Sequence, residues 1–464
     1  MGTYTKAQLT EQLERIQAAT DACRNAIITM GVNVPIDAKL ADLATYAALI
    51  QCSHPDIPCY YIGNSDIPLS TRKNVYFDTG LYGGTNITFD AVFSKSVAYN
   101  DGMLFGADDS TSTSFFFIPL YNRSYKYWFC NRLAGRNELT SGSSSGLEDT
   151  FIHYSSNTNL EGSDVYGIVM NGVHDKYNTI NSSSKHTSNT IYLFARNKGA
   201  SGVDCKSPSG SKLRYISFYD NGNLVRFYIP VLHYVNDTYT PCLYDMVNKT
   251  YNYNLGTDTP SYSAMNAYLL TDIHYTSNKT DMTLGFATNY NSDYYMRFDA
   301  AYTPSTESLA DNSSKMLLGN RTSSSIAYGL YSSVYSSGQK AAVLYPSSKS
   351  ILGSTISANN RYTLSAYIGY DGGALVLNNT KTTGYNSPSS SGSGLQMYIL
   401  GNGLVYANTK LEYGVISDRY RINSLHAIPI IDNSTNTVSF YDLDAQTSYT
   451  YNGDSSQLGY DLLV

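Results

Sequence analysis

The sequence predicts a mainly β protein: a short N-terminal α-helical, coiled-coil-like segment, then two tandem antiparallel β-sandwich (jelly-roll) domains. Three observations lead there. The first 30 residues carry an apolar period of 3.5, short strand-like runs broken by turn residues follow, and this β region recurs about 200 residues later. The expected domains are a helical oligomerisation and anchoring segment at 1–53, a first sandwich at 58–258 and a second at 264–464.

The helical segment is expected over residues 5–30, with a second short helix over 37–51. Gly31 and Pro35 end the first helix in the usual order of a C-terminal glycine followed by proline. Its apolar residues alternate spacings of four and three, as the a and d positions of a coiled coil do: Leu9, Leu13, Ile16, Thr20, Cys23, Ile27 and Met30.

Two interpretations of this seam remain open, a helical hairpin packed on its own β domain and self-association of several copies into a bundle. We favour self-association, because a lone helix of this length is marginal in water and the seam is narrow. A homotrimer is expected, although Thr20 and Cys23 do not fix the number of copies.

The repeat in the β region rests on matched landmarks that keep a nearly constant separation. Residues 87–93 match 296–302, so that Phe89 and Phe298 are 209 positions apart. The pairs Pro230/Pro429 and Asp245/Asp442 are 199 and 197 positions apart. A separation this steady over two whole halves indicates tandem domains. The expected joint between them is 256–264.

The composition favours strands that carry hydroxyl groups instead of charges. Charged residues make up 15% of the chain, whereas 45 residues are tyrosine. Ordinary domains carry about 25% charged residues. We therefore expect a tyrosine-rich surface, which suits contact with other molecules because tyrosine offers area at little entropic cost.

The charge pattern excludes several classes of partner. The net charge is −6 and no Lys/Arg cluster occurs, so no nucleic acid is expected as partner. No apolar run approaches the length of a membrane span, and the polar N-terminus does not resemble a signal peptide. The chain is therefore expected to be made in the cytoplasm.

Six cysteines without any C-x-x-C pattern predict free, mostly buried thiols, with Cys52 and Cys59 the one pair near in sequence. Catalytic patterns are missing too: no E-x-D-x-x-E strand, no H-E-x-x-H pair and no nucleophile elbow occurs. Glu148-Asp149 is the nearest carboxylate pair, and a solvated turn explains it better than a dyad. We therefore expect no enzyme, no catalytic residue and no required cofactor.

Calcium is the one metal that the pattern leaves open. Loop carboxylates could supply oxygen ligands, although ordinary turn chemistry accounts for them more simply: Asp101, Asp108, Asp109, Asp432, Asp442 and Asp444.

Aromatic residues are the remaining functional signal. Two clusters could stack on sugar rings while Arg or Asn side chains hold hydroxyl groups, namely Tyr121, Arg123, Tyr125, Tyr127 and Trp128, then Tyr290 and Tyr294. The alternative for the first cluster is a core strand with one solvent-exposed face, which is the commoner situation.

Several stretches resemble concanavalin/laminin-G-like jelly rolls of bacteriophage virion proteins and of gut bacterial surface proteins. They are the opening Val75-Tyr76-Phe77-Asp78-Thr79-Gly80, and the closing residues 192–197, 216–226 and Leu243-Tyr244-Asp245. Residues 26–35 and 43–46 resemble the segment that begins tail or head fibre proteins. The second half keeps Pro429 and Tyr441-Asp442 but lacks the Asn221-Gly222 turn.

The resemblance implies a virion protein, a phage fibre or appendage that attaches to the host surface, with a surface glycan as the candidate ligand, and to other virion proteins through its N-terminal segment. Two alternatives stay open: a capsid-decorating protein without a ligand, and a capsular polysaccharide depolymerase. A resemblance in fold does not specify a ligand.

Overall fold

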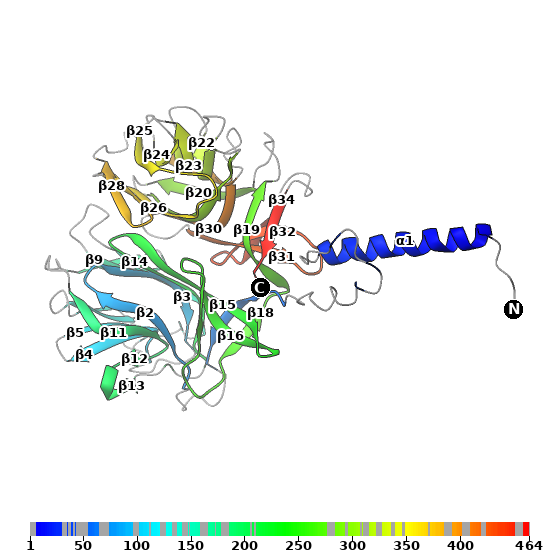
Figure 1. The fold of residues 1–464 in the computed structure, drawn as a ribbon. Helices are drawn as coiled ribbons and strands as arrows, with labels where there is room; N and C mark the ends of the chain where they lie inside the picture. Colours follow the sequence, from blue (N-terminus) through cyan, green and yellow to red (C-terminus); the bar gives the residue numbers. More distant parts are fainter. Residues whose placement is uncertain are drawn as a thin grey trace. The chain divides into compact units, whose positions relative to one another are not determined.

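The computed structural model describes a helix and two β-sandwiches (Figure 1). The residues it describes are 6–29, 35, 39, 42, 54–64, 74–95, 102–110, 113–120, 127–131, 137–141, 147, 149–157, 166–171, 173–177, 185–204, 207, 210–275, 284–292, 296–306, 309, 315–321, 327–335, 339–345, 349–369, 372–384, 392–400, 409–418, 424–450 and 458–463. They form two compact units, one ending at Pro55 and one spanning Asp56–Leu463.

Helix α1 (Lys6–Thr29) is the predicted first helix. Good helix formers fill it and neither Gly nor Pro interrupts it. Local contacts support it: Gln17 donates to Asp21 (3.2 Å), which also pairs with Arg24 at 2.8 Å. The predicted second helix at 37–51 lies almost entirely outside the described residues.

The first sandwich consists of two sheets. The larger has the order β10 (Val173–Tyr177), β9 (Tyr166–Met170), β8 (Ile152–Asn157), β3 (Ile87–Ser94), β14 (Lys212–Asp220), β1 (Ile57–Gly63), β15 (Asn223–Val235), β16 (Thr238–Asp245) and β17 (Thr250–Tyr253), with β18 (Ser261–Ala264) on β1. The smaller runs β2 (Phe77–Gly84), β11 (His186–Leu193), β4 (Phe105–Ser110), β5 (Thr113–Pro119), β6 (Tyr127–Asn131) and β7 (Asn137–Ser141), and the short strands β12 (Arg196–Asn197) and β13 (Val203–Asp204) extend from β4.

The second sandwich repeats this arrangement. Its larger sheet has the order β28 (Thr380–Gly384), β27 (Gly372–Leu377), β26 (Tyr362–Gly369), β21 (Met296–Pro304), β30 (Thr409–Asp418), β19 (Ala267–Tyr275), β31 (Ser424–Asp432), β32 (Val438–Asp442) and β33 (Thr447–Thr450), with β34 (Leu458–Leu462) on β19. Its smaller sheet runs β20 (Leu284–Ser292), β29 (Gly392–Ile399), β22 (Lys315–Arg321), β23 (Ala327–Tyr335), β24 (Gln339–Tyr345) and β25 (Lys349–Thr355).

The strand orders confirm the duplication. Each described strand of the second sandwich occupies the place of one in the first, from β1 and β19 at the start to β18 and β34 at the end. The predicted fold class, mainly β with tandem antiparallel sandwiches, is therefore confirmed. The landmark pairs fall on equivalent strands: Asp90 with Asp299 on β3 and β21, and Asp245 with Asp442 at the ends of β16 and β32.

The predicted joint between the sandwiches is wrong in one respect. Residues Ser261–Ala264, expected in a linker, form β18 and pair with β1 of the first sandwich, where Tyr262 lies opposite Ile62. The first sandwich therefore extends to Ala264 and not to residue 258. The physical reason is that β14 and β15 pair with β1 only at Ile62–Gly63 and Ile57–Pro58, so backbone groups of β1 between them would otherwise lack a partner strand.

Each sandwich has its own core, and a third core lies between the two. On β14, Leu213, Ile216 and Phe218 face the first core, whereas Tyr215 and Tyr219 face the shared cluster. That cluster also contains Tyr413, Val415, Ile428 and Ile430 of the second sandwich. The larger sheets are thus buried on both faces, which explains the near-continuous apolar runs of their central strands.

The expectation of a tyrosine-rich surface holds for only some of the tyrosines. Among the residues whose burial is described, eight of the nine largest fully buried side chains are tyrosines, which build the cores and the junction: Tyr127, Tyr154, Tyr215, Tyr219, Tyr228, Tyr302, Tyr331 and Tyr413. Exposed ones also occur, among them Tyr60, Tyr82 and Tyr262.

Candidate functional site

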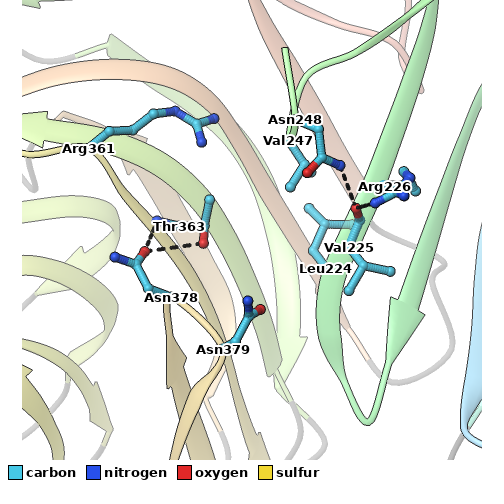
Figure 2. Close-up of a pocket in the computed structure, with 9 residues that line it drawn as sticks. All are labelled: Leu224, Val225, Arg226, Val247, Asn248, Arg361, Thr363, Asn378 and Asn379. Carbon is cyan, nitrogen blue, oxygen red and sulfur yellow. Dashed lines mark hydrogen bonds between the residues drawn. The ribbon is translucent and has the colours of Figure 1, made fainter. Parts of the chain in front are cut away.

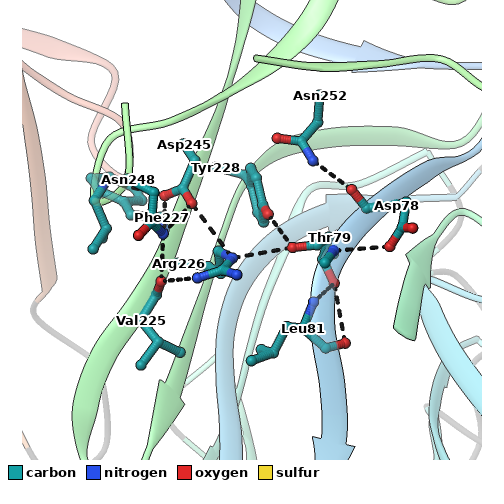
Figure 3. Close-up of polar contacts among 12 residues, drawn as sticks. Asp78, Thr79, Leu81, Val225, Arg226, Phe227, Tyr228, Asp245, Asn248 and Asn252 are labelled. Carbon is teal, nitrogen blue, oxygen red and sulfur yellow. Dashed lines mark hydrogen bonds and ion pairs between the residues drawn. The ribbon is translucent and has the colours of Figure 1, made fainter. Parts of the chain in front are cut away.

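A buried aspartate organises the turn after β16. Asp245 Oδ1 accepts the backbone N–H groups of Phe227 (3.1 Å) and Val247 (3.0 Å), and Oδ2 accepts Asn248 Nδ2 at 2.6 Å (Figure 3). Burial raises the pKa of Asp245, although these hydrogen bonds oppose the rise. The Leu-Tyr-Asp stretch is thus explained by a turn that needs a buried acceptor.

Arg226 connects this turn to the opening strand of the sandwich. Its Nε donates to the Thr79 carbonyl (3.1 Å) and lies 3.6 Å from Asp245 Oδ2. Tyr228 donates its hydroxyl to the same carbonyl at 2.8 Å, and Asn252 Nδ2 donates to the Asp78 carbonyl (Figure 3). The opening and closing motifs noted in the sequence therefore meet in one polar network.

The second sandwich has the same turn with different neighbours. Asp442 Oδ1 accepts the N–H groups of Asp444 (2.9 Å) and His426 (3.4 Å), the equivalents of Val247 and Phe227. The aspartate of the first turn therefore binds the N–H groups of two apolar residues, and the aspartate of the second turn binds those of two ionisable residues.

A pocket of about 400 Å³ opens beside the first of these turns, where the two sandwiches meet. Figure 2 shows its two walls, one from the first sandwich and one from the second. The lining residues are Leu224, Val225, Arg226, Val247 and Asn248 on one wall, and Arg361, Thr363, Asn378 and Asn379 on the other.

Arg361, one of two arginines that line the pocket, has a carboxylate partner. Arg361 contacts Glu412 through Nε (3.0 and 2.9 Å) and Nη2 (2.8 Å), and Lys249 Nζ lies 2.9 Å from the same carboxylate. Burial alone would lower the pKa of Arg361, but the hydrogen bonds and charge of Glu412 outweigh it and raise the pKa. The guanidinium is thus held charged and fixed in direction.

The place equivalent to this pocket at the other end of the junction is occupied by a hydrogen-bonded cluster. Asp444 accepts the Tyr215 hydroxyl (2.5 Å) and contacts His426 Nδ1 (2.7 Å), while His153 Nε2 contacts Asp90 at 2.5 Å. The ring of His426 stacks on Tyr215 at 4.2 Å between centroids.

The two carboxylates that follow this second turn differ in pKa. Burial raises the pKa of Asp442 to about 7, and the charge of Asp444 adds to the rise. Burial would also raise the pKa of Asp444, but the charge and hydrogen bond of His426 outweigh it and leave the pKa below its ordinary value.

The predicted aromatic cluster around Trp128 does not form a site in the described residues. Tyr127 is fully buried and stacks on Phe117, so its assignment to carbohydrate contact is wrong; strand alternation turns it inward with Phe129. Trp128 is half-buried against Phe116. Tyr121, Arg123 and Tyr125 lie outside the described residues.

The weaker aromatic cluster is partly described. Tyr290 pairs through its backbone with Leu395, and Tyr294 lies outside the described residues.

The aspartates considered for calcium bind N–H and O–H groups of the chain. Asp109 accepts the backbone N–H groups of Ser188 and Asn189, Asp432 caps the turn at Ser434, and Asp108 accepts the Ser114 hydroxyl. Within the described part of the chain no cluster of three potential metal ligands occurs, and Asp101 lies outside that part.

Three of the four seam residues of α1 whose side chains are described are exposed to solvent. Leu13 is 67% exposed, Ile16 is 51% exposed and Cys23 is exposed. Thr20 is buried and donates its hydroxyl to the Ile16 carbonyl. Nothing is described of the side chains of Leu9 and Ile27, and Met30 lies outside the described residues.

The described cysteines beyond α1 are free and buried, as predicted: Cys59, Cys130 and Cys242. Cys52 lies outside the described residues. In the part of the chain that the structure describes, no helix is both long and apolar enough to cross a bilayer.

Sequence reasoning missed the pocket as a site. Its first wall, residues 224–226 and 247–248, lies in or beside the stretches that carry the family resemblance, which was a usable signal. Its second wall comes from residues more than 100 positions later, and no local pattern marks Thr363 or Asn378 as lining a pocket.

Comparison with known proteins finds similarity to solved structures only. No family model and no curated protein matches the chain. It is similar to mouse laminin α1 chain domains LG4-5, with 9% identity over 87% of this chain and 94% of that chain and a TM-score of 0.28. It is also similar to the LG1-3 region of the laminin α2 chain, with 10% identity over 89% of this chain and 66% of that chain and a TM-score of 0.26.

Sialidases also appear among the solved structures that are similar to the chain. For Trypanosoma rangeli sialidase the identity is 10%, with 67% of this chain and 65% of that chain covered and a TM-score of 0.23. These likenesses concern the β-sandwich fold and specify neither activity nor ligand.

Proposed function

We propose that the chain is an oligomeric appendage protein of a bacteriophage virion, whose paired sandwiches contact the bacterial surface. The observation that carries the proposal is the exposed a/d seam of α1, where Leu13 and Ile16 leave most of their side chains in water. Burying them between copies would contribute about 1 to 2 kcal/mol for each side chain.

The proposal also draws on the sequence of the N-terminal segment. Residues 26–35 and 43–46 resemble the start of phage fibre proteins, where such a segment joins copies to one another and to other virion proteins. The sandwiches then project as pairs. Several copies raise the effective concentration of weak sites, so a modest single-site affinity suffices for attachment.

Light scattering of the full chain at micromolar concentration tests the assembly. We expect a mass three times the 51.1 kDa of one chain. The double variant Leu13→Glu/Ile16→Glu should shift the mass toward one chain, since charges at a and d positions oppose bundling. Ala18→Glu/Ala22→Glu, which places the same charges at exposed positions off the seam, should keep the assembled mass. A monomeric unmodified chain would refute the proposal.

A glycan array probed with the intact oligomer tests the attachment role. Binding to bacterial surface oligosaccharides is the expected result. An oligomer that binds none of them, yet decorates virions when these are imaged, would instead identify a decorating protein without a ligand.

A further inference from the structure

We infer that the pocket between the two sandwiches is a subsite for a neutral pyranose ring of a surface glycan. This rests on the proposed attachment function and adds to it the site and the class of ligand. The pocket residues come from both halves of the duplication, so the site exists only because the two sandwiches are joined (Figure 2).

One wall of the pocket carries a small apolar patch. It consists of Leu224 on β15 and Val247 on the turn after β16, which are 3% and 8% exposed, whereas Val225 packs against the core of the first sandwich. The patch is held in place, because the Leu224 N–H donates to Ser365 of the second sandwich at 3.0 Å. A sugar presents C–H groups on one face of its ring, and such a wall removes them from water.

The opposite wall offers amide groups with hydrogen-bonding capacity to spare. Asn378 Oδ1 accepts the Thr363 N–H (2.8 Å), and Asn379 Oδ1 accepts Asn223 Nδ2 (2.6 Å). These bonds fix each amide with its oxygen engaged and leave the two Nδ2 groups as donors.

The first wall supplies the complementary acceptor. Asn248 Nδ2 donates to Asp245 and to the Val225 carbonyl (3.0 Å), which leaves its Oδ1 as an acceptor beside the apolar patch. Hydroxyl groups both donate and accept, so a donor on Asn379 and an acceptor on Asn248, on opposite walls of the pocket, suit a polyhydroxylated ring.

The charges of the pocket favour a neutral ligand over an anion. Arg361 is engaged with Glu412, and Arg226 lies beside Asp245 with its Nε and Nη1 on backbone carbonyls. A phosphate or carboxylate would have to compete with carboxylates that these guanidinium groups already contact. Arg361 Nη1 can still donate to a hydroxyl.

The duplicated fold allows the pocket to be compared with the equivalent place elsewhere in the junction. There, His153 occupies the position equivalent to Thr363, His426 that equivalent to Phe227, and Asp444 that equivalent to Val247. The larger polar side chains fill that place with the cluster around Tyr215, whereas Thr363 and Val247 leave about 400 Å³ open. This volume lies within the ~300–1,000 Å³ of small-molecule sites.

The test measures binding of the full-length oligomer to immobilised neutral and uronic-acid-bearing oligosaccharides. Thr363→Trp, which fills the pocket from its second wall, should abolish binding to the neutral probes. Val173→Trp, at a position 63% exposed on β10, is the matched control and should bind as the unmodified protein does. Unchanged unfolding midpoints would show that both variants are folded.

A milder change reports on one hydrogen bond. Asn379→Ala at the exposed rim should weaken binding about 3- to 10-fold, and Asn433→Ala, an exposed asparagine outside the pocket, should not.

Three results would overturn the inference: binding that survives Thr363→Trp, binding restricted to the acidic probes, or no binding by an oligomer of the expected mass. The mass is measured separately by light scattering, so failure of the pocket and failure of assembly are told apart.

Discussion

Replacing Tyr215 by Phe should weaken the junction between the sandwiches. The hydroxyl of Tyr215, fully buried on β14 of the first sandwich, donates to Asp444 of the second at 2.5 Å. The change removes one oxygen atom and keeps the stacking of the ring on His426. It therefore isolates one charge-assisted hydrogen bond across the junction.

The expected loss is about 1.5 to 3 kcal/mol of the free energy of unfolding, the usual range for a hydrogen bond to a charged group. Asp444 has a lowered pKa, because His426 outweighs the effect of burial. A carboxyl with a lowered pKa contributes stability above its unfolded pKa and loses it as the pH falls through the folded value. The effect of Tyr215→Phe should thus persist from neutral pH down to about pH 4.

Urea unfolding followed by circular dichroism measures the loss. Tyr154→Phe is the matched control: Tyr154 is fully buried as well, but its hydroxyl has no hydrogen-bond partner among the residues that the structure describes, so the change should be neutral or stabilising. Equal destabilisation by the two changes would refute the reasoning, since the bond to Asp444 would then contribute nothing.

Three further predictions follow from the same contacts. Cys23 should form an interchain cross-link under mild oxidation if the helices run parallel in a seam, and non-reducing gels would show its loss in Cys23→Ser. Asp245→Ala should lower the free energy of unfolding by about 2 to 4 kcal/mol, measured by urea denaturation, because it leaves buried N–H groups without an acceptor. The pKa of Asp442, raised to about 7, means that the folded state holds a proton which the unfolded state releases above about pH 4. The unmodified chain should therefore lose stability relative to Asp442→Asn as the pH rises from 4 to 8 in a series of urea titrations, and an unchanged difference would count against the raised value.

Local patterns were sufficient to predict the elements and the duplication. The uninterrupted run of helix formers gave α1, and landmarks such as Asp245 and Asp442 sit at equivalent turns because each accepts two backbone N–H groups there. Because the turn requires this acceptor, both copies have an aspartate there, and the repeat could be recognised in the sequence.

The packing of the two sandwiches against each other could not be predicted from the sequence. Asp90 and Asp299 were recognised as equivalent, yet their position on the face toward the other sandwich depends on how two whole sheets pack. The tyrosines were expected on the surface because composition does not distinguish a wet strand face from one covered by a second sheet. The pocket joins segments over 100 residues apart for the same reason.

The core between the sandwiches has a consequence for synthesis on the ribosome. The first sandwich is complete at Ala264, but one face of its larger sheet stays bare until Leu443, about 180 residues later, has been made. At roughly 5–20 residues per second this interval lasts about 10 to 40 s. During it the face can pair with its counterpart on a neighbouring nascent chain, so copies gathered early by their helices would risk exchanging halves. Folding of each chain into its own pair of sandwiches should accordingly precede bundling.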